Sequence, residues 1–390
     1  MKKNTLKSDK QINILLYKIF NQLKDSFSVL KNNYLLDIDF KIKLLENNVI
    51  FPKSDLKNAF PSNFKSTINE KIKYEIKKEF NIKGKVVTIY FLSENKSSFK
   101  ILFNKLSMIL LWLEFLFSNI KTQCSDIITI YLYDINNPKC LPKNGRKTLY
   151  DYDVNTAFTF CCVPNNEIII FRKEEWFKVF IHETFHSFGL DFARLDSSFI
   201  NSKLKDIFNL DINFELTESW CETWARIFNI IFACYWHNHQ YSNYKLFQKD
   251  FYKKLNLETG FSVFQMNKIL KLSGLKYNDL INNNNLEKYN ENTAVFSYYI
   301  ITSLNLINIK DFIKWCFSNN KIPYQFLVSD SNLISYINFI KTISFKKSTS
   351  EYIYYIKTCK TKKTCKTKKI FLKPKIKKTL RMSINDIEFI

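Results

Sequence analysis

The segment IHETFHSFG at residues 181–189 restricts the fold more than any other part of this sequence. His182 and His186 are four residues apart, so on a helix both side chains project from the same face. Gly189 suits the end of that helix, because glycine readily adopts the left-handed conformation of a helix C-cap. We therefore expect a helix over residues 174–188 that presents two imidazoles side by side.

Two histidines in this arrangement are suited to bind one metal ion. Imidazoles four residues apart, with a glutamate beside the first, are the pattern of a zinc hydrolase, in which the glutamate takes a proton from a water that the metal activates. The sequence contains four histidines in total, so a match to this pattern rarely arises by chance. The motif predicts a Zn²⁺ site held by His182 and His186, with Glu183 as general base.

A catalytic zinc ion needs a third protein ligand, and two geometries are open. In the metzincin pattern, HExxHxxG continues to a third histidine three residues beyond the glycine. The corresponding residue here is Phe192, which cannot bind a metal. Asp191 lies one residue out of register and stays as an alternative.

The second geometry takes a carboxylate from the following helix. The stretch FELTESWCETWARIFN offers Glu215, Glu218 and Glu222 among residues typical of a buried helix. Glu218 and Glu222 are four residues apart, so one of them can bind zinc while the other holds a ligand histidine through its second ring nitrogen. We take Glu218 as the ligand and keep Glu222 as the alternative.

Residues 168–232 resemble the gluzincin metallopeptidases, the thermolysin-like group in which HExxH on one helix is followed by a ligand glutamate on the next. The resemblance implies a zincin fold and peptide-bond hydrolysis with one Zn²⁺. Carried over by position, it implies His182, His186 and Glu218 as ligands, Glu183 as general base and Glu222 as the supporting acid. This sequence departs from the family in two ways. The supporting acid, here Glu222, is usually Asp in the family, and the 31 residues between His186 and Glu218 exceed the thermolysin spacing.

The segments VNTAFTF and EIIIFRKEEWFKVFIHETFHSFGLDF are also similar to an uncharacterised group of HExxH proteins of large cytoplasmic DNA viruses. The sequence is rich in Lys, Asn, Ile, Phe and Tyr, whose codons are A/T-rich, and this agrees with the similarity. The similarity implies a location in the host cytoplasm or the virion, and it implies no particular substrate.

Short β-branched runs and helical patterns share the first half of the chain, which predicts an α+β fold. We expect a zincin-like arrangement, in which a small mixed sheet packs on the active-site helix and a mainly helical C-terminal region follows. The expected strands cover residues 86–92, 126–133, 157–162 and 167–171, and further helices cover 97–120 and 217–236.

Four regions are expected along the chain. They are a lysine-rich helical region at 1–80, a zincin-like catalytic region at 81–240, a helical subdomain at 241–346 and a basic flexible tail at 347–390. The tail repeats the hexad TCKTKK and has no apolar face that could dock, which predicts flexibility and dispensability.

The net charge of +23 raises the question of a nucleic-acid partner, but five of the 59 basic residues are arginine, the residue best suited to phosphate recognition. A contact through the basic tail therefore stays a lesser alternative. Nine cysteines without a CxxC pair predict reduced thiols. With no secretory signal and no apolar run of about 20 residues, we expect a cytoplasmic protein without a membrane span.

Further features bear on a peptide or protein substrate. Residues 155–160 are the natural edge strand for pairing with an extended peptide, and Tyr298 or Tyr299 could donate a phenol to the oxyanion. His237 and His239, two residues apart, cannot share a helical face and are expected at the surface. The expected function is peptide-bond hydrolysis. The alternatives are a non-catalytic zincin-fold binding or virion-structural protein and a basic nucleic-acid-associated factor.

Overall fold

The structure is a computed structural model, and it describes residues 9–35, 38–46, 49–142, 145–236, 243–282, 289–359 and 373–385. The chain divides into two compact units. The sheet unit contains Leu15–Pro138 and Asn155–Leu190, and the helical unit contains Met1–Ile14, Lys139–Val154 and Asp191–Ile390. The two units therefore alternate along the sequence.

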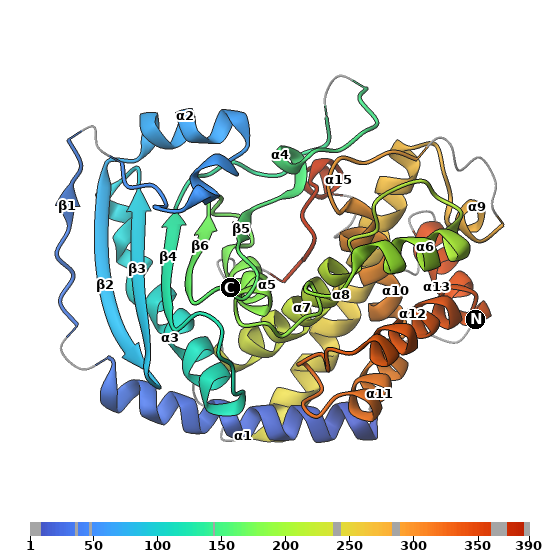
Figure 1. The fold of residues 1–390 in the computed structure, drawn as a ribbon, viewed down its shortest axis with the longest axis horizontal. Coiled ribbons are helices and arrows are strands. Elements are labelled where there is room, and N and C mark those ends of the chain that lie inside the picture. The colour runs from blue at the N-terminus through green and yellow to red at the C-terminus, as the bar shows by residue number, and fades with distance from the viewer. Residues whose placement is uncertain are drawn as a thin grey trace. The chain divides into compact units, whose positions relative to one another are not determined.

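A mixed sheet with the strand order β1-β2-β3-β4-β6-β5 forms the sheet unit (Figure 1). β3 pairs in parallel with β4, and β4 pairs in parallel with β6, whereas the outer pairs are antiparallel. The six strands are β1 Lys43–Leu44, β2 Tyr74–Ile82, β3 Lys85–Ser93, β4 Ile127–Tyr133, β5 Ala157–Thr159 and β6 Asn165–Ile170.

Helices cover this sheet, and the central strand β4 is accordingly a nearly continuous apolar run. The helical elements are α1 Lys10–Asn33, η1 Asp55–Asn58, α2 Ser62–Lys71, η2 Lys96–Ile101, α3 Leu102–Asn119 and α5 Trp176–Ser187. Tyr131, Tyr133 and Ile169 pack with apolar residues of α2 and of the segment before it. Helices α3 and α5 contact each other, and α5 also contacts β5 and β6. The sheet thus supports the helix that carries the HETFH motif.

The helical unit is organised around one helix, α7 Leu216–Trp236, whose residues are almost all buried. Its other elements are α4 Asp151–Val154, α6 Ser197–Phe208, α8 Tyr244–Leu272, α9 Tyr277–Ile281, the π-helix η4 Phe296–Ile301, α10 Thr302–Ile307, α11 Ile309–Asn319, α12 Asp330–Ser344, α13 Lys347–Cys359 and α15 Pro374–Lys378. Helices α8, α10 and η4 contact α7 directly.

The predicted α+β class is confirmed, with a mixed sheet and a mostly helical remainder. All four expected strands are present, with ends displaced by three residues or fewer. The expected helical character of residues 241–346 is confirmed in the ranges that the structure describes. None of the helices in these ranges combines the length and apolar character that crossing a membrane requires.

The region 1–80, expected to be lysine-rich and helical, is helical only in part. It also contains β1 and most of β2, and from Leu15 onward it belongs to the sheet unit. In β2, YEIKKEFNI, Lys77 and Glu79 are exposed while Ile76 and Ile82 are buried. These charged residues interrupt the apolar pattern that predicts a strand, so the pattern does not predict β2.

The expectation of a flexible tail at 347–390 is wrong for the described residues 347–359 and 373–385. Residues 347–359 form α13, and Leu380 and Met382 are buried in the helical unit. The N–H of Leu380 donates to the carbonyl of Lys139 at 3.0 Å, so this segment has backbone partners as well. The apolar residues that anchor it are few and follow a lysine-dense stretch, which concealed them. Most of the hexad repeat, residues 360–369, lies outside the described residues.

One pair of cysteines differs from the expectation of reduced thiols. Cys124 and Cys162 form a disulfide across 38 residues of sequence, a spacing that carries no recognisable motif. Five other cysteines of the described ranges are not disulfide-bonded, namely Cys140, Cys161, Cys221, Cys234 and Cys316. The cysteine content is therefore no argument for a reducing compartment.

Candidate metal centre

Helix α5 carries the HETFH motif in the sheet unit, and both of its ends are defined by the backbone. Glu175, before the first turn, has a left-handed conformation with a φ of 61°. At the other end Gly189 has a φ of 62°, and the N–H of Leu190 donates to the carbonyl of Phe185 at 2.9 Å, which is a Schellman cap. The predicted helix and its glycine stop are confirmed.

A buried hydrogen bond fixes how α5 is turned about its axis. Trp112 of α3 donates its indole N–H to Thr184 Oγ1 at 2.9 Å, and both side chains are fully buried. Thr184 is two residues from each histidine, or about 200° around the helix. With Thr184 held against α3, His182 and His186 must project from the opposite side of α5.

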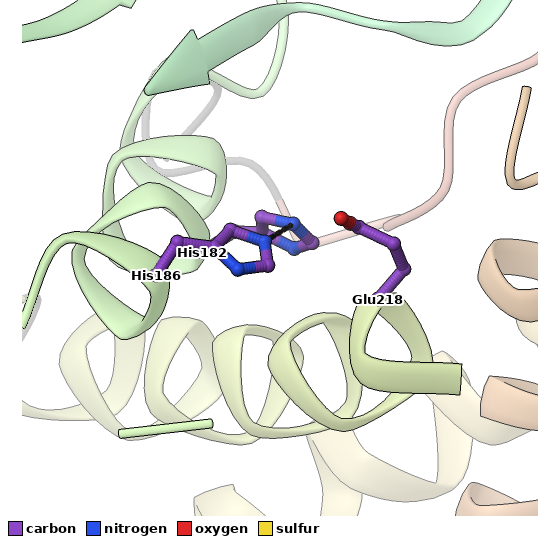
Figure 2. A group of neighbouring side chains, drawn as sticks. All are labelled: His182, His186 and Glu218. Atoms are coloured by element: carbon purple, nitrogen blue, oxygen red, sulfur yellow. Dashed lines mark hydrogen bonds between the residues drawn. The ribbon is translucent and has the colours of Figure 1, made fainter. Parts of the chain in front are cut away.

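The two imidazole rings converge on one point (Figure 2). Nε2 of His186 lies 3.2 Å from Nε2 of His182, and both side chains are buried. Two Zn–N bonds of about 2.0–2.1 Å that meet at the tetrahedral angle place their nitrogens about 3.3 Å apart. The spacing within the sheet unit therefore fits two ligands of one tetrahedral ion.

Glu183 follows the first of these histidines and is itself buried, with 7% of its surface exposed. Its position, directly after the first histidine on α5, is that of the general base in the HExxH pattern.

The carboxylates predicted for the following helix lie in the helical unit. Glu218 and Glu222 are one turn apart on α7, and Glu218 in the first turn is half-buried. Glu222 is fully buried and its Oε1 accepts a hydrogen bond from Arg226 Nε at 2.8 Å. The two carboxylates therefore differ, because one is engaged in a buried ion pair and the other stands near the helix end. Figure 2 draws Glu218 with the two histidines.

Arg226 extends this ion pair into a buried network. Its guanidinium also donates to Ser262 Oγ at 2.8 Å and to the Tyr298 carbonyl at 3.2 Å, and it lies 3.9 Å from a carboxylate oxygen of Glu258. Burial raises the pKa of the Glu258 carboxyl, while Arg226 opposes that rise. Glu258 also receives hydrogen bonds from Ser383, Ile384 and Asn385 of the C-terminal segment.

Asp191 behaves as a turn residue. Its Oδ1 accepts the N–H of Ala193 at 3.3 Å, and its Oδ2 lies 3.6 Å from the Cys221 thiol, which donates to it. Phe192, at the third-ligand position of the metzincin pattern, is buried against Phe326 with ring centroids 4.4 Å apart. Both residues have structural partners within the helical unit.

The two candidate tyrosines lie on the π-helix η4, and they differ in their surroundings. Tyr299 is buried, and its hydroxyl donates to the carbonyl of Leu380. Tyr298 is half-buried. Of the two, Tyr299 is engaged in holding the C-terminal segment, which leaves Tyr298 as the candidate oxyanion donor. A π-helix is often found at functional sites.

The strand expected to bind substrate does lie at an edge of the sheet. β5 is the last strand in the order and pairs with β6 in an antiparallel register, Phe158 opposite Ile169. His237 and His239 lie outside the described residues.

Sequence reasoning missed the residues that support the candidate ligands. Arg226 follows Glu222 by four residues, a helical spacing that could have revealed the pair. Trp112 left no comparable signal, because its partner Thr184 is 72 residues away in the sequence.

Comparison of the chain with protein-family models, with curated proteins and with solved structures gives no match. Arguments about function therefore depend on the residues described above.

Proposed function

We propose that this protein is a zinc-dependent peptidase of the gluzincin type. The observation that carries the proposal is the 3.2 Å separation of the His182 and His186 Nε2 atoms on α5, together with buried Glu183, which follows His182 in the sequence. Two converging imidazoles next to a buried carboxylate are the parts that a zinc hydrolase requires.

We further propose that Glu218 of the helical unit is the third ligand. Two histidines and one glutamate are a set of side chains that can hold a metal ion. Glu222, whose carboxylate pairs with Arg226 and is fully buried, is better suited to support a ligand than to bind the ion. Asp191 has partners of its own in a turn.

The residues then have separate roles in hydrolysis. Zinc supplies Lewis-acid chemistry, lowering the pKa of water towards about 7 and polarising a carbonyl. Glu183 accepts the proton of the attacking water and passes it to the leaving amine. Tyr298 is the proposed donor to the oxyanion, and the edge strand β5 is the proposed partner of an extended peptide or protein substrate.

Metal analysis and peptide cleavage together test this function. Purified protein should contain about one zinc ion per chain, and it should hydrolyse peptides in a mixture followed by mass spectrometry. His186→Ala should lose the metal. Glu183→Gln should keep it and lose at least about 100-fold in turnover, because it removes the base and spares the ligands.

Glu79→Gln is the matched control, because it removes an exposed carboxylate of the same unit. It should change neither property. Protein that binds zinc but cleaves no peptide would favour the non-catalytic binding function instead. Protein without zinc would remove the basis of the proposal.

A further inference from the structure

The C-terminal end of α5 has an unusual set of partners. The last carbonyls of a helix have no partner within the helix and need one from elsewhere. Here three consecutive carbonyls, beginning at the candidate ligand His186, receive donors from two loops. The pairs are Cys162 N–H to the His186 carbonyl at 3.1 Å, Ser125 Oγ to the Ser187 carbonyl at 2.8 Å and Thr122 Oγ1 to the Phe188 carbonyl at 2.9 Å.

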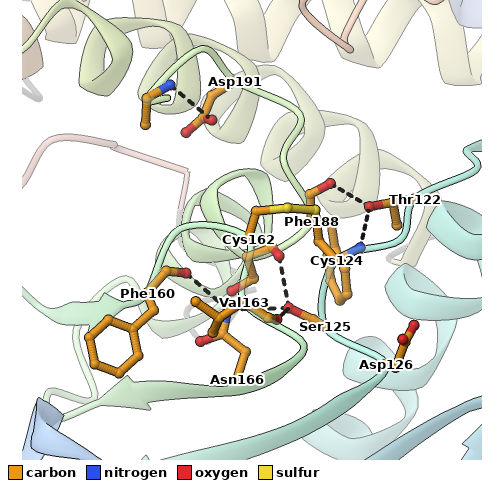
Figure 3. Close-up of a disulfide and its surroundings, with 12 residues drawn as sticks. Thr122, Cys124, Ser125, Asp126, Phe160, Cys162, Val163, Asn166, Phe188 and Asp191 are labelled. Carbon is orange, nitrogen blue, oxygen red and sulfur yellow. Dashed lines mark hydrogen bonds between the residues drawn. A yellow bond between two sulfur atoms is a disulfide. The ribbon is translucent and has the colours of Figure 1, made fainter. Parts of the chain in front are cut away.

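The Cys124–Cys162 disulfide joins the same two loops (Figure 3). Cys124 lies between Thr122 and Ser125 in the loop that leads into β4, and Cys162 lies in the loop that follows β5. The disulfide therefore connects the loop that supplies both hydroxyls with the loop that supplies the backbone N–H. Both cysteines are half-buried, so small thiols can reach the bond.

The helix stop also packs directly on the disulfide. A Cβ built on Gly189 would lie 3.1 Å from Cys124 Sγ and 3.4 Å from Cys162 Sγ, so the sulfur atoms occupy the space beside the glycine. Ser125 fixes the loops further, because its N–H donates to the Val163 carbonyl at 2.9 Å and its Oγ accepts from Asn166 Nδ2 at 3.2 Å. The helix end, the two loops and the sulfur bridge are thus one packed assembly.

We propose that the Cys124–Cys162 disulfide and the hydroxyls of Thr122 and Ser125 position His186, so that the zinc affinity of the protein depends on its thiol redox state. This inference rests on the proposed zinc site. His186 directly precedes Ser187, the last residue of α5, whereas His182 lies one turn further from that end. Loosening the cap therefore shifts the backbone of His186 before that of His182. The disulfide holds the cap donors in place in the oxidised protein.

The redox step balances with an ordinary thiol–disulfide exchange. Two cysteine thiols lose two protons and two electrons as the Sγ–Sγ bond forms, and a small soluble disulfide accepts them and becomes two thiols. A dithiol reductant reverses the step. No other co-reactant is needed.

The experiment compares zinc affinity with and without the bridge. The proteins are oxidised wild type, Cys124→Ser/Cys162→Ser, and the control Cys140→Ser, which removes an exposed cysteine that is not disulfide-bonded. Alkylation and intact mass give the thiol state, competition with a chromogenic chelator gives the affinity, and the visible spectrum of bound Co²⁺ reports ligand geometry. The double variant should bind zinc about 10- to 100-fold more weakly with an altered Co²⁺ spectrum, and the control should match wild type.

If the double variant folds poorly, substitution of Thr122 tests the same proposal with the disulfide intact. Thr122→Val removes the hydroxyl at nearly constant shape and should weaken zinc binding. Thr122→Ser keeps the hydroxyl and should bind zinc as wild type does. A purely structural role would lower thermal stability without changing the Co²⁺ spectrum.

Two results would overturn this inference alone: equal zinc affinity and spectra with and without the bridge, or free thiols at both positions in the oxidised protein. Wild-type protein that binds no zinc would overturn the proposed function as well. The outcomes are therefore distinguishable.

Discussion

The buried polar contacts of α5 in the sheet unit and of α7 in the helical unit include groups of different kinds. On α5, Thr184 accepts the indole N–H of Trp112, and the Ser187 carbonyl accepts the hydroxyl of Ser125, so both contacts are neutral hydrogen bonds. On α7, Arg226 contacts the carboxylates of Glu222 and Glu258, so the contact is charged.

The difference has consequences for what each unit tolerates. A neutral hydrogen bond contributes about 0.5–1.5 kcal/mol to stability, whereas breaking a buried ion pair costs about 3–5 kcal/mol. Single substitutions in the Arg226 network should therefore cost more stability than substitutions of these neutral contacts of α5. Substitutions of the α5 contacts in the sheet unit should lower the metal affinity first, because these contacts orient α5 and cap its C-terminal end.

The largest expected effect tests whether the helical unit supplies a ligand at all. Glu218→Ala should purify nearly free of zinc, and Glu222→Ala should bind zinc about 10- to 100-fold more weakly than wild type, because it removes a supporting group. Asp191→Ala should retain the metal. Competition with a chromogenic chelator ranks the three affinities.

Two outcomes would change the assignment. If Asp191→Ala binds most weakly, a metzincin-like site with a displaced carboxylate replaces the gluzincin site. If Glu222→Ala binds most weakly, Glu222 is the ligand and the supporting role passes to Glu218.

The next effect compares a buried charge with an exposed one. Glu258→Ala should lower the free energy of unfolding by about 3–5 kcal/mol, since it removes the buried acceptor of Ser383 and Asn385 and one of the two carboxylates beside Arg226. The exposed pair of Asp311 and Lys346, at 2.6 Å, is the control, and Asp311→Ala should cost at most about 1 kcal/mol. Urea denaturation measures both. Similar losses in both variants would show that the buried network contributes no more to stability than the exposed ion pair.

A third prediction concerns the pH dependence of the helical unit. Burial raises the pKa of Glu291 to about 8 from an ordinary 4.5, and the Glu215 carboxylate adds to the rise, while hydrogen bonds from Tyr289 and the Phe296 N–H oppose it. Between these two pKa values the folded state holds a proton that the unfolded state has released. The free energy of unfolding should therefore fall as the pH rises through this window, by at most about 1.4 kcal/mol per pH unit.

Glu291→Gln removes this titration and keeps the shape of the side chain. Its stability relative to wild type should increase from pH 5 to pH 8 on the order of the same slope, as measured by urea unfolding at each pH. A constant difference across that range would contradict a raised pKa in the folded state.

The smallest effect tests the neutral contact that turns α5. Thr184→Val leaves the indole N–H of Trp112 buried without its acceptor and should cost about 1–2 kcal/mol of stability. Thr88→Val, which affects an exposed contact to Glu79 at 3.4 Å, is the control and should be near neutral. Zinc affinity should fall only for Thr184→Val, and an unchanged affinity would show that this bond does not aim the histidines.

The contrast between the units also explains what the sequence could predict. The strands of the sheet unit are short apolar runs, and α5 carries its chemistry in adjacent residues, so both could be identified from local patterns. β2 could not be identified in this way, because its exposed charged residues interrupt the apolar pattern. The disulfide escaped because only the fold brings Cys124 to Cys162.

In the helical unit, local patterns predicted the helices but not the side-chain contacts that hold them together. The spacing of Glu218 and Glu222 on α7 predicted that the two carboxylates act together. It did not predict the buried ion pair of Glu222 with Arg226, which makes their environments different. Glu258 meets Ser383 from 125 residues away, and no periodicity records such a contact. Buried Leu380 and Met382 were hidden by the lysines before them.

The contact of Glu258 with the C-terminal segment has a consequence for how the protein is made. Ribosomes add about 5–20 residues per second, so the 125 residues that separate Glu258 from Ser383 correspond to roughly 6–25 seconds of synthesis. During that interval α8 has emerged while the residues that complete its environment have not. A nascent chain therefore exposes a carboxylate and an arginine that the finished protein buries, and this open stage is where a chaperone or a protease would meet it.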